Sequence, residues 1–215
     1  MKNTILALSI LLTAASSGKS DETKPLLFQK PAVSRTHVAF GFAGDLWIVP
    51  REGGEARRLT NGVGLETDPI FSPDGTQVLA ASLDGTLQLW DISTGANLAR
   101  FNEKHSGKAL TVVLSQPSSP LFGAEIKVLS GGTDKKVKLW DFSTGKLERE
   151  FVGHEDTVTS VAFSPDNTMA LSGSCDHTIR LWWLAGKAPE KEIILTLPEG
   201  EPSQQNSQGS PSTLP

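Results

Sequence analysis

Residues 163–186 read FSPDNTMALSGSCDHTIRLWWLAG, and the same frame occurs twice earlier in the chain. The earlier copies read FSPDGTQVLAASLDGTLQLWDISTG (71–95) and VLSGGTDKKVKLWDFSTG (128–145). In every copy an Asp precedes the Trp by six residues: Asp84 and Trp90, Asp134 and Trp140, Asp176 and Trp182. Successive Trp residues lie 50 and 42 positions apart, and an insertion of seven residues in the loop 115–125 accounts for all but one residue of the difference. A period near 42 indicates a repeated structural unit.

Each unit has the pattern of four short strands joined by tight turns. In the third copy we expect strands at 157–163, 168–174, 178–183 and 192–197. Pro73 and Gly75 suit a type I turn after Ser72, and Asp84-Gly85 is a hairpin signal. Four strands in about 42 residues are typical of a β-propeller blade. We therefore predict an all-β fold of four-stranded antiparallel blades, about four in number, forming a propeller that is incomplete or closed by oligomerisation.

The segments LQLWDISTG, VKLWDFSTG and FVGHEDTVTSVAFSPDNTMALSGSCDHTIRLW resemble WD-repeat propellers over about residues 66–195. The resemblance implies a structural hydrogen-bond network of His, Asp, Ser or Thr, and Trp in each blade. In the third copy these positions are His154, Asp176, Trp182 and either Ser172 or Ser174. The second copy keeps His105, Asp134 and Trp140, whereas the first keeps Asp84 and Trp90 but has Gly62 at the His position.

Residues 31–62 form a further unit of different character. Gly44 aligns with Gly85 at an offset of 41, which places Trp47 at the position of Gln88 and not at that of Trp90. The run DLWIVPREGGEARRLT, followed by LETDPIFSPDG, resembles the TolB-like blades of tricorn-type peptidases over about residues 25–75. Nothing in the sequence corresponds to the separate domains in which such peptidases carry their catalytic Ser and His.

The two ends of the chain differ in composition from the repeats. The start, MKNTILALSILLTAASSG, has a Lys, an apolar run and small residues, which is the layout of a signal peptide cleaved between Ala14 and Ser17. The last residues are rich in Pro, Ser and Gln and have too little apolar surface to fold. We expect a signal peptide at 1–17, a polar linker at 18–30, the propeller arc at 31–197 and a disordered tail at 198–215. The protein is then exported, to a periplasmic or extracellular location.

The run Ser174-Cys175-Asp176-His177 collects reactive side chains, but we do not expect catalysis there. Neighbours on a strand point to opposite faces, so these four cannot converge on one substrate atom. Asp176 is better explained as the acceptor for the imidazole of the network, His177 as an exposed turn residue, and Cys175 as a small residue buried near a turn. The four His residues lack the spacing of a metal site, and we expect no metal and no cofactor.

The net charge of −4 argues against nucleic acid as a partner, because phosphate binding requires a basic surface. We expect no stable membrane insertion once the signal peptide is removed. Protein or peptide partners fit best, including a second propeller chain or a second copy of this one, with loop 115–125 as a contact surface.

The predicted function is a non-catalytic interaction scaffold, and the alternative is a truncated propeller segment of a tricorn-type peptidase that gates peptide substrates. Three outcomes stay open for the uncovered blades: pairing with a second copy, completion by another propeller chain, or a poorly folding truncated product.

Overall fold

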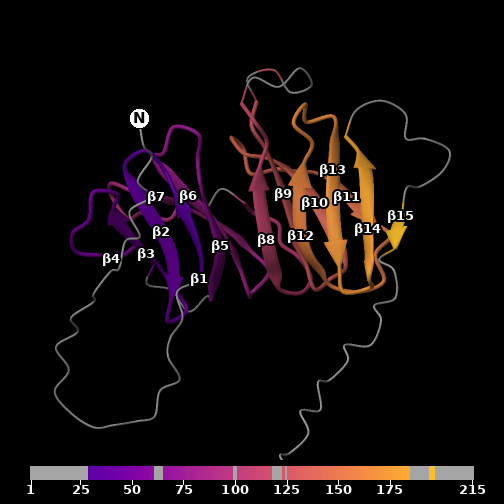
Figure 1. The fold of residues 1–215 in the computed structure, drawn as a ribbon, viewed down its shortest axis with the longest axis horizontal. Helices are drawn as coiled ribbons and strands as arrows, with labels where there is room; N and C mark the ends of the chain where they lie inside the picture. The colour runs from indigo at the N-terminus through magenta and orange to yellow at the C-terminus, as the bar shows by residue number, and fades with distance from the viewer. Residues whose placement is uncertain are drawn as a thin grey trace, which may run out of the picture.

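The computed structural model describes residues 29–60, 65–98, 101–117, 123, 125–184 and 194–196, and its strands form four separate antiparallel sheets (Figure 1). We call them blades 1 to 4 in chain order. Blade 1 comprises β1 (Gln29–Val33), β2 (His37–Phe42), β3 (Asp45–Pro50) and β4 (Arg57–Arg58), and blade 2 comprises β5 (Glu66–Phe71), β6 (Gln77–Ser82) and β7 (Leu87–Asp91). Blade 3 comprises β8 (Ala109–Leu114), β9 (Lys127–Gly132), β10 (Lys136–Asp141) and β11 (Leu147–Val152). Blade 4 comprises β12 (Val158–Phe163), β13 (Met169–Ser174), β14 (Thr178–Trp183) and β15 (Ile194–Thr196).

The blades stand side by side in an arc that does not close, with blade 1 and blade 4 at its two ends (Figure 1). The first strands of the blades, β1, β5, β8 and β12, lie next to one another along the inner side of the arc. Within each blade the following strands run outward in chain order. The predicted fold class, an incomplete propeller built of antiparallel blades, is confirmed.

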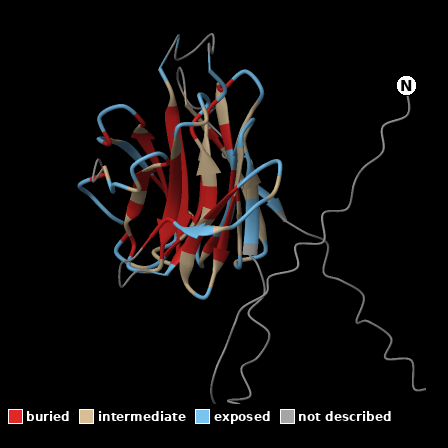
Figure 2. Cartoon of the chain, turned by 90° about the vertical axis from the view of Figure 1, so that its left-hand side faces the viewer, coloured by how far each residue is buried: buried red, intermediate tan, exposed pale blue. Residues whose placement is uncertain are grey.

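Every blade has two different faces, which we name by their side chains. At each junction the aliphatic face of one blade packs on the indole face of the following blade, and in blades 2 to 4 the indole face carries the repeat Trp. Three buried clusters result, one at each blade junction, and Figure 2 shows buried residues running through the strands while turns are exposed. Their main members are Leu46, Ile48, Val78 and Trp90 between blades 1 and 2; Leu79, Leu89, Val128 and Trp140 between blades 2 and 3; and Leu129, Leu139, Ala170 and Trp182 between blades 3 and 4. Most of the hydrophobic stabilisation therefore lies between sheets, because that is where the apolar area is removed from water.

The expected strands of the third copy agree with β12 to β15 to within one or two residues at each end. Blade 2 has three strands, and an isolated bridge between Trp90 and Asn97 stands where a fourth strand would begin. Blade 1 has four strands, and β1 begins at Gln29, two residues inside the segment expected to be a linker.

The hairpin of blade 1 is one residue shorter than the repeat hairpins. Phe42 pairs with Asp45 across a two-residue turn of Ala43 and Gly44, both at positive φ, which is the geometry of a tight hairpin. In blade 2 the chain needs a three-residue turn between Ser82 and Thr86. The alignment of blade 1 with blade 2 at an offset of 41 residues therefore holds after Gly44, whereas before Gly44 the two blades differ by one residue in register.

Candidate functional site

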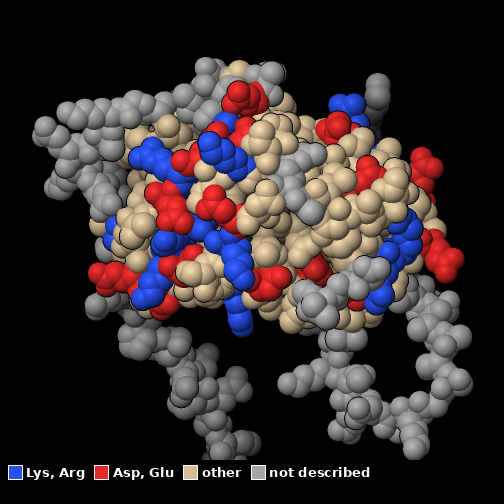
Figure 3. Space-filling view, turned by 180° about the vertical axis from the view of Figure 1, so that it is seen from behind, with Lys and Arg blue, Asp and Glu red and all other residues tan. Residues whose placement is uncertain are grey.

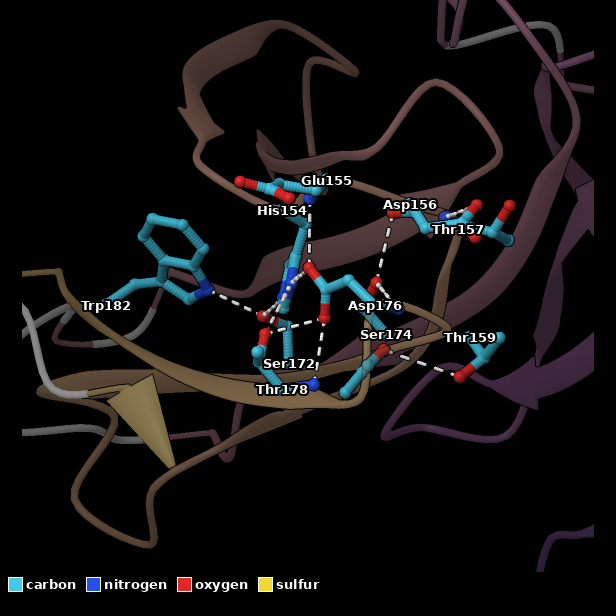
Figure 4. Close-up of polar contacts among 11 residues, drawn as sticks. His154, Glu155, Asp156, Thr157, Thr159, Ser172, Ser174, Asp176, Thr178 and Trp182 are labelled. Carbon is cyan, nitrogen blue, oxygen red and sulfur yellow. Dashed lines mark hydrogen bonds and ion pairs between the residues drawn. The ribbon is translucent and has the colours of Figure 1, made fainter. Parts of the chain in front are cut away.

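In blade 4 one buried hydroxyl, on β13, links a Trp on β14 to a His in the segment before β12 (Figure 4). Trp182 Nε1 donates a hydrogen bond of 2.8 Å to Ser172 Oγ, and the same oxygen lies 2.7 Å from His154 Nε2. His154 Nδ1 lies 2.7 Å from Asp176 Oδ2 at the hairpin between β13 and β14. Because an indole N–H can only donate, one consistent pattern has Ser172 donating to His154 and His154 donating to the carboxylate. All four predicted partners are thus brought together.

Ser172, and not Ser174, completes the network. Ser174 lies two residues nearer the hairpin, where its hydroxyl donates to the carbonyl of Asp156 at 3.0 Å and accepts from the N–H of Asp176 at 3.1 Å. Ser172 is 1% exposed, whereas Ser174 is half-buried. The alternative left open by the sequence is therefore decided by how far each residue lies from the turn.

Blade 3 repeats the network with one member that the sequence reasoning missed. Trp140 Nε1 donates to Ser130 Oγ at 2.9 Å, Ser130 Oγ lies 2.8 Å from His105 Nε2, and His105 Nδ1 lies 2.8 Å from Asp134 Oδ1. Ser130 stands ten residues before Trp140, as Ser172 stands ten before Trp182, so the spacing contained the signal. The His105 side chain is fully buried, which leaves it no access to a substrate in solution.

Blade 2 lacks the buried hydroxyl. Ala80 occupies the position ten residues before Trp90, and Trp90 Nε1 is buried without a hydrogen-bond partner among the described residues. Asp84 is exposed and accepts from the N–H and hydroxyl of Thr86 at 2.9 and 2.7 Å. Gly62, which takes the His position, lies outside the described residues. The prediction that this network is incomplete agrees with the unpartnered indole.

A different polar cluster occupies the junction of blades 1 and 2. Thr60 Oγ1 accepts the N–H of Leu46 at 2.9 Å and lies 3.1 Å from Asp45 Oδ1 and 3.3 Å from Glu66 Oε2. Burial raises the pKa of Glu66, and the charge of Asp45 acts in the same direction. Sequence reasoning did not identify this cluster, since none of its members belongs to the repeat frame.

The four reactive side chains at 174–177 do not form a catalytic site. Asp176 points at His154 (Figure 4), His177 is exposed at φ 64°, and Ser174 is bonded to backbone groups. The prediction that Cys175 is buried was wrong: it is exposed, because its N–H is tied to the carbonyl of Thr157 while the side chain points outward from the turn. Among the described residues no group of three or more His, Cys, Asp or Glu side chains is placed to hold a metal ion.

Hydrogen bonding sets the charge state of the network carboxylates. Partial burial alone would raise the pKa of Asp176, but hydrogen bonds from Thr178 and His154 outweigh it and hold the pKa well below its usual range. Burial and His105 oppose each other in the same way at Asp134, whose pKa is also lowered. Both carboxylates are therefore ionised acceptors at neutral pH.

Ion pairs are concentrated on the outer part of blade 3. Burial alone would lower the pKa of Lys127, yet its three carboxylate partners raise it well above the ordinary value. Those partners are Glu125 and Glu148 at 2.8 Å and Asp141 at 3.1 Å. Acidic and basic side chains interleave on the face seen in Figure 3, so the ion pairs do not leave a patch of one sign there.

Two polar side chains that the sequence reasoning missed join neighbouring blades. Asp68 lies at a register shift in β5, at φ 54°, and accepts the N–H of Val112 on β8 at 2.9 Å. Asn167 is fully buried at φ 56° and exchanges hydrogen bonds of 3.1 and 3.3 Å with the backbone of Gln116. Asn167 takes the place that Gly75 has in blade 2, and Asn is the non-glycine residue that best tolerates this conformation.

Comparison with protein families assigns the repeat. Residues 61–91, 97–141 and 145–182, together more than half of the chain, match the family model described as "WD domain, G-beta repeat". No match tests the resemblance of residues 25–75 to TolB-like blades, which stays a prediction.

Two relatives illustrate the likeness. The chain is 28% identical over 184 residues to MST50-interacting protein 11 of Pyricularia oryzae, a match covering 64% of this chain and 56% of that protein. It is 32% identical over 133 residues to guanine nucleotide-binding protein subunit beta of Zea mays, covering 59% of this chain and 33% of that one. The chain thus spans about half the length of the first relative and a third of the second.

Two solved structures of computationally designed proteins share the arrangement of blades. The Ika4 protein is 26% identical with a TM-score of 0.63, and the match covers 79% of this chain and 100% of that one. The Ika8 protein is 27% identical with a TM-score of 0.61, and the match covers 73% of this chain and 46% of that one.

Replacing Ser172 by Ala is expected to lower the free energy of unfolding by about 2–4 kcal/mol, because Trp182 Nε1 and His154 Nε2 are both left buried without a partner. Ser174→Ala is the matched control and should cost at most about 1 kcal/mol. Urea unfolding of both variants measures the difference. Equal losses would show that Ser172 does not bridge the two rings.

Supplying the missing hydroxyl should stabilise blade 2. Ala80→Ser places an Oγ where Ser130 and Ser172 stand in the other blades, and we expect a gain of about 1 kcal/mol from the new bond to Trp90. Ala81→Ser adds the same group on the opposite, aliphatic face and should cost about 1–3 kcal/mol. Urea unfolding tests both, and a loss of stability in Ala80→Ser would contradict the assignment.

The two network carboxylates should make the fold sensitive to acid. Since folding lowers the pKa of Asp176, its contribution is complete above about pH 4–5, where an unfolded Asp is ionised, and is lost as the pH falls through the native value. Asp176→Asn should therefore be clearly less stable than wild type near pH 6, with the gap narrowing toward about pH 2. Unfolding free energies measured across this range test it. A gap that stays constant with pH would mean that the carboxylate charge contributes nothing.

Proposed function

The chain belongs to the WD-repeat family, and on that premise we propose that it is an exported, non-catalytic scaffold that binds protein or peptide partners at the rim of its blades. The names of its relatives fit such a role, since one is an interacting protein and another is a subunit of a complex. Fold and family alone do not assign a function, so the proposal depends on how the polar side chains are used.

The observation that carries the proposal is the use of the His, Ser and Asp side chains as internal braces. The His105 and His154 side chains are fully buried, and each bonds one Ser and one Asp of its own blade. Those side chains would be the natural candidates for acid–base or nucleophilic chemistry, and their partners leave them no site that a substrate could reach. A binding role requires only the surfaces around them.

The favoured docking rim is the end of the blades that carries the connections after the first strands. Strand β8 leads into loop 115–125 there, at the same end as the Ser72–Gly75 turn, and residues 118–122 and 124 of this loop lie outside the described residues. A pocket of about 510 Å³ opens at that end between blades 1 and 2, lined by Arg35, Arg51, Phe71 and the turn. Two guanidinium groups beside an aromatic ring suit a peptide segment with acidic and apolar side chains.

Export is proposed from the signal-peptide pattern of residues 1–17, which lie outside the described residues. No helix among the residues that the structure describes is long and apolar enough to cross a membrane. The mass of the chain recovered from the cell envelope tests the proposal directly, because export predicts a new N-terminus between Ala14 and Ser17.

The scaffold role is tested by identifying a partner and then mapping its site. The wild-type chain is used to capture proteins from the cell envelope, and a captured protein is purified and its affinity measured. Arg35→Glu/Arg51→Glu should weaken that affinity at least about tenfold, whereas Lys135→Glu, in the hairpin at the other end of blade 3, should not. An affinity unchanged by the double variant, and by shortening loop 115–125, would contradict docking at this rim.

A further inference from the structure

The two ends of the arc carry unlike faces, and no blade among the described residues packs on the aliphatic face of blade 4. In blade 3 this face consists of Leu129, Val137, Leu139 and Phe151, which blade 4 buries to 5% exposure or less. The same pair positions in blade 4 are Leu171, Ile179, Leu181 and Leu195. Leu171 is 37% and Leu195 51% exposed. Blade 4 thus repeats, position by position, a surface that the chain elsewhere covers with a blade.

Two equivalent glycines show how open this face is. A methyl group built on Gly131 would lie 2.5 Å from the Val158 side chain of blade 4. A methyl group on Gly173, the equivalent position of blade 4, meets no atom of the described residues within 4 Å. The close approach that seals blade 3 is therefore missing from blade 4.

Blade 1 presents the opposite kind of face. The side turned away from blade 2 carries Val33, Val38 and Val49, with Phe40 paired to Trp47. Val49 stands where Trp90 stands in blade 2, so this is the indole side of the blade. Phe40 and Val49 are already buried, whereas Val33 is 65% exposed and Trp47 half-buried, with its Nε1 lacking a partner among the described residues. Val33 and Trp47 are therefore only partly covered by the rest of the chain.

All three junctions within the chain join an aliphatic face to an indole face, in that order. The free faces at the two ends are again one aliphatic face, on blade 4, and one indole face, on blade 1. None of the residues named on these two faces is charged. We propose that two copies of this chain join head to tail, the aliphatic face of blade 4 in each copy packing on the indole face of blade 1 in the other, and close a ring of eight blades. Head-to-tail contacts produce a closed ring when the rotations between successive copies add up to a full turn, and in this proposal two copies complete the turn.

A further observation favours a second copy as the occupant. The arc matches the whole of one designed chain but 46% of another of like blade geometry, so two such arcs in series account for most of the larger chain. This inference concerns the end faces of the arc and does not depend on partner binding at the docking rim, where Val33 also lines the pocket.

The test is the mass of the purified chain by light scattering, with one charge placed on each face. Wild type should have twice the mass of a single chain. Leu195→Asp and Val33→Asp should each raise the dimer dissociation constant at least about tenfold, because both contacts of the ring contain the altered face. Val152→Asp is the matched control: Val152 is 68% exposed at the end of β11, the outermost strand of blade 3, and lies on neither end face of the arc, so the dimer should persist. Circular dichroism confirms that each variant is folded.

Mixing the two face variants gives the most specific readout. A mixed pair has one contact with both substitutions and one wild-type contact, so equimolar Leu195→Asp and Val33→Asp should recover dimers that neither forms alone. A wild-type monomer at all soluble concentrations overturns the proposal. So does a dimer that Leu195→Asp dissociates and Val33→Asp leaves intact, since that pattern means two blade 4 faces in contact. Open-ended assemblies larger than a dimer overturn the closed ring.

Discussion

Contact between an aliphatic face and an indole face holds this molecule together, since no described strand of one blade is hydrogen-bonded into the sheet of another. A blade of three or four short strands has two apolar faces and cannot bury either of them alone. Stacking buries both, so each blade depends on its neighbours, as expected for a repeat architecture. The direction of the contact is constant along the arc, and this polarity makes the two ends unlike and suited to each other.

The hydrogen-bonded His, Ser and Asp side chains act within that packing. They hold the Trp in one orientation on its face, because its N–H can bond only where Ser172 or Ser130 stands. They also tie the segment before the first strand to the hairpin after the second, through the His–Asp contact. Side chains that elsewhere serve catalysis are here constraints on geometry, and a binding role leaves them undisturbed.

Much of the fold and of the polar network could be predicted from the sequence, because the repeat shows which residues are equivalent in successive blades without knowledge of the fold. The Asp–Trp spacing of six residues is the length of one hairpin arm, and it identified the partners of His154 and His105. The prediction that failed, the burial of Cys175, concerns a turn. Strand β13 ends at Ser174, so the alternation of side chains along the strand could not predict the orientation of Cys175. Asp68 and Asn167 could not be predicted, since each acts across a blade junction and Asp68 lies at a register shift within β5.

The unequal bracing of the blades has a dynamic consequence. Blades 3 and 4 each have a closed chain of polar bonds from hairpin to indole, whereas in blade 2 the indole is unsupported. Cooperative units in proteins open with different free energies according to such local differences. Fluctuations should therefore begin in the N-terminal half and spread toward the C-terminal half, so that amide protons exchange with solvent in that order and the last two blades act as the template on which the others reassemble.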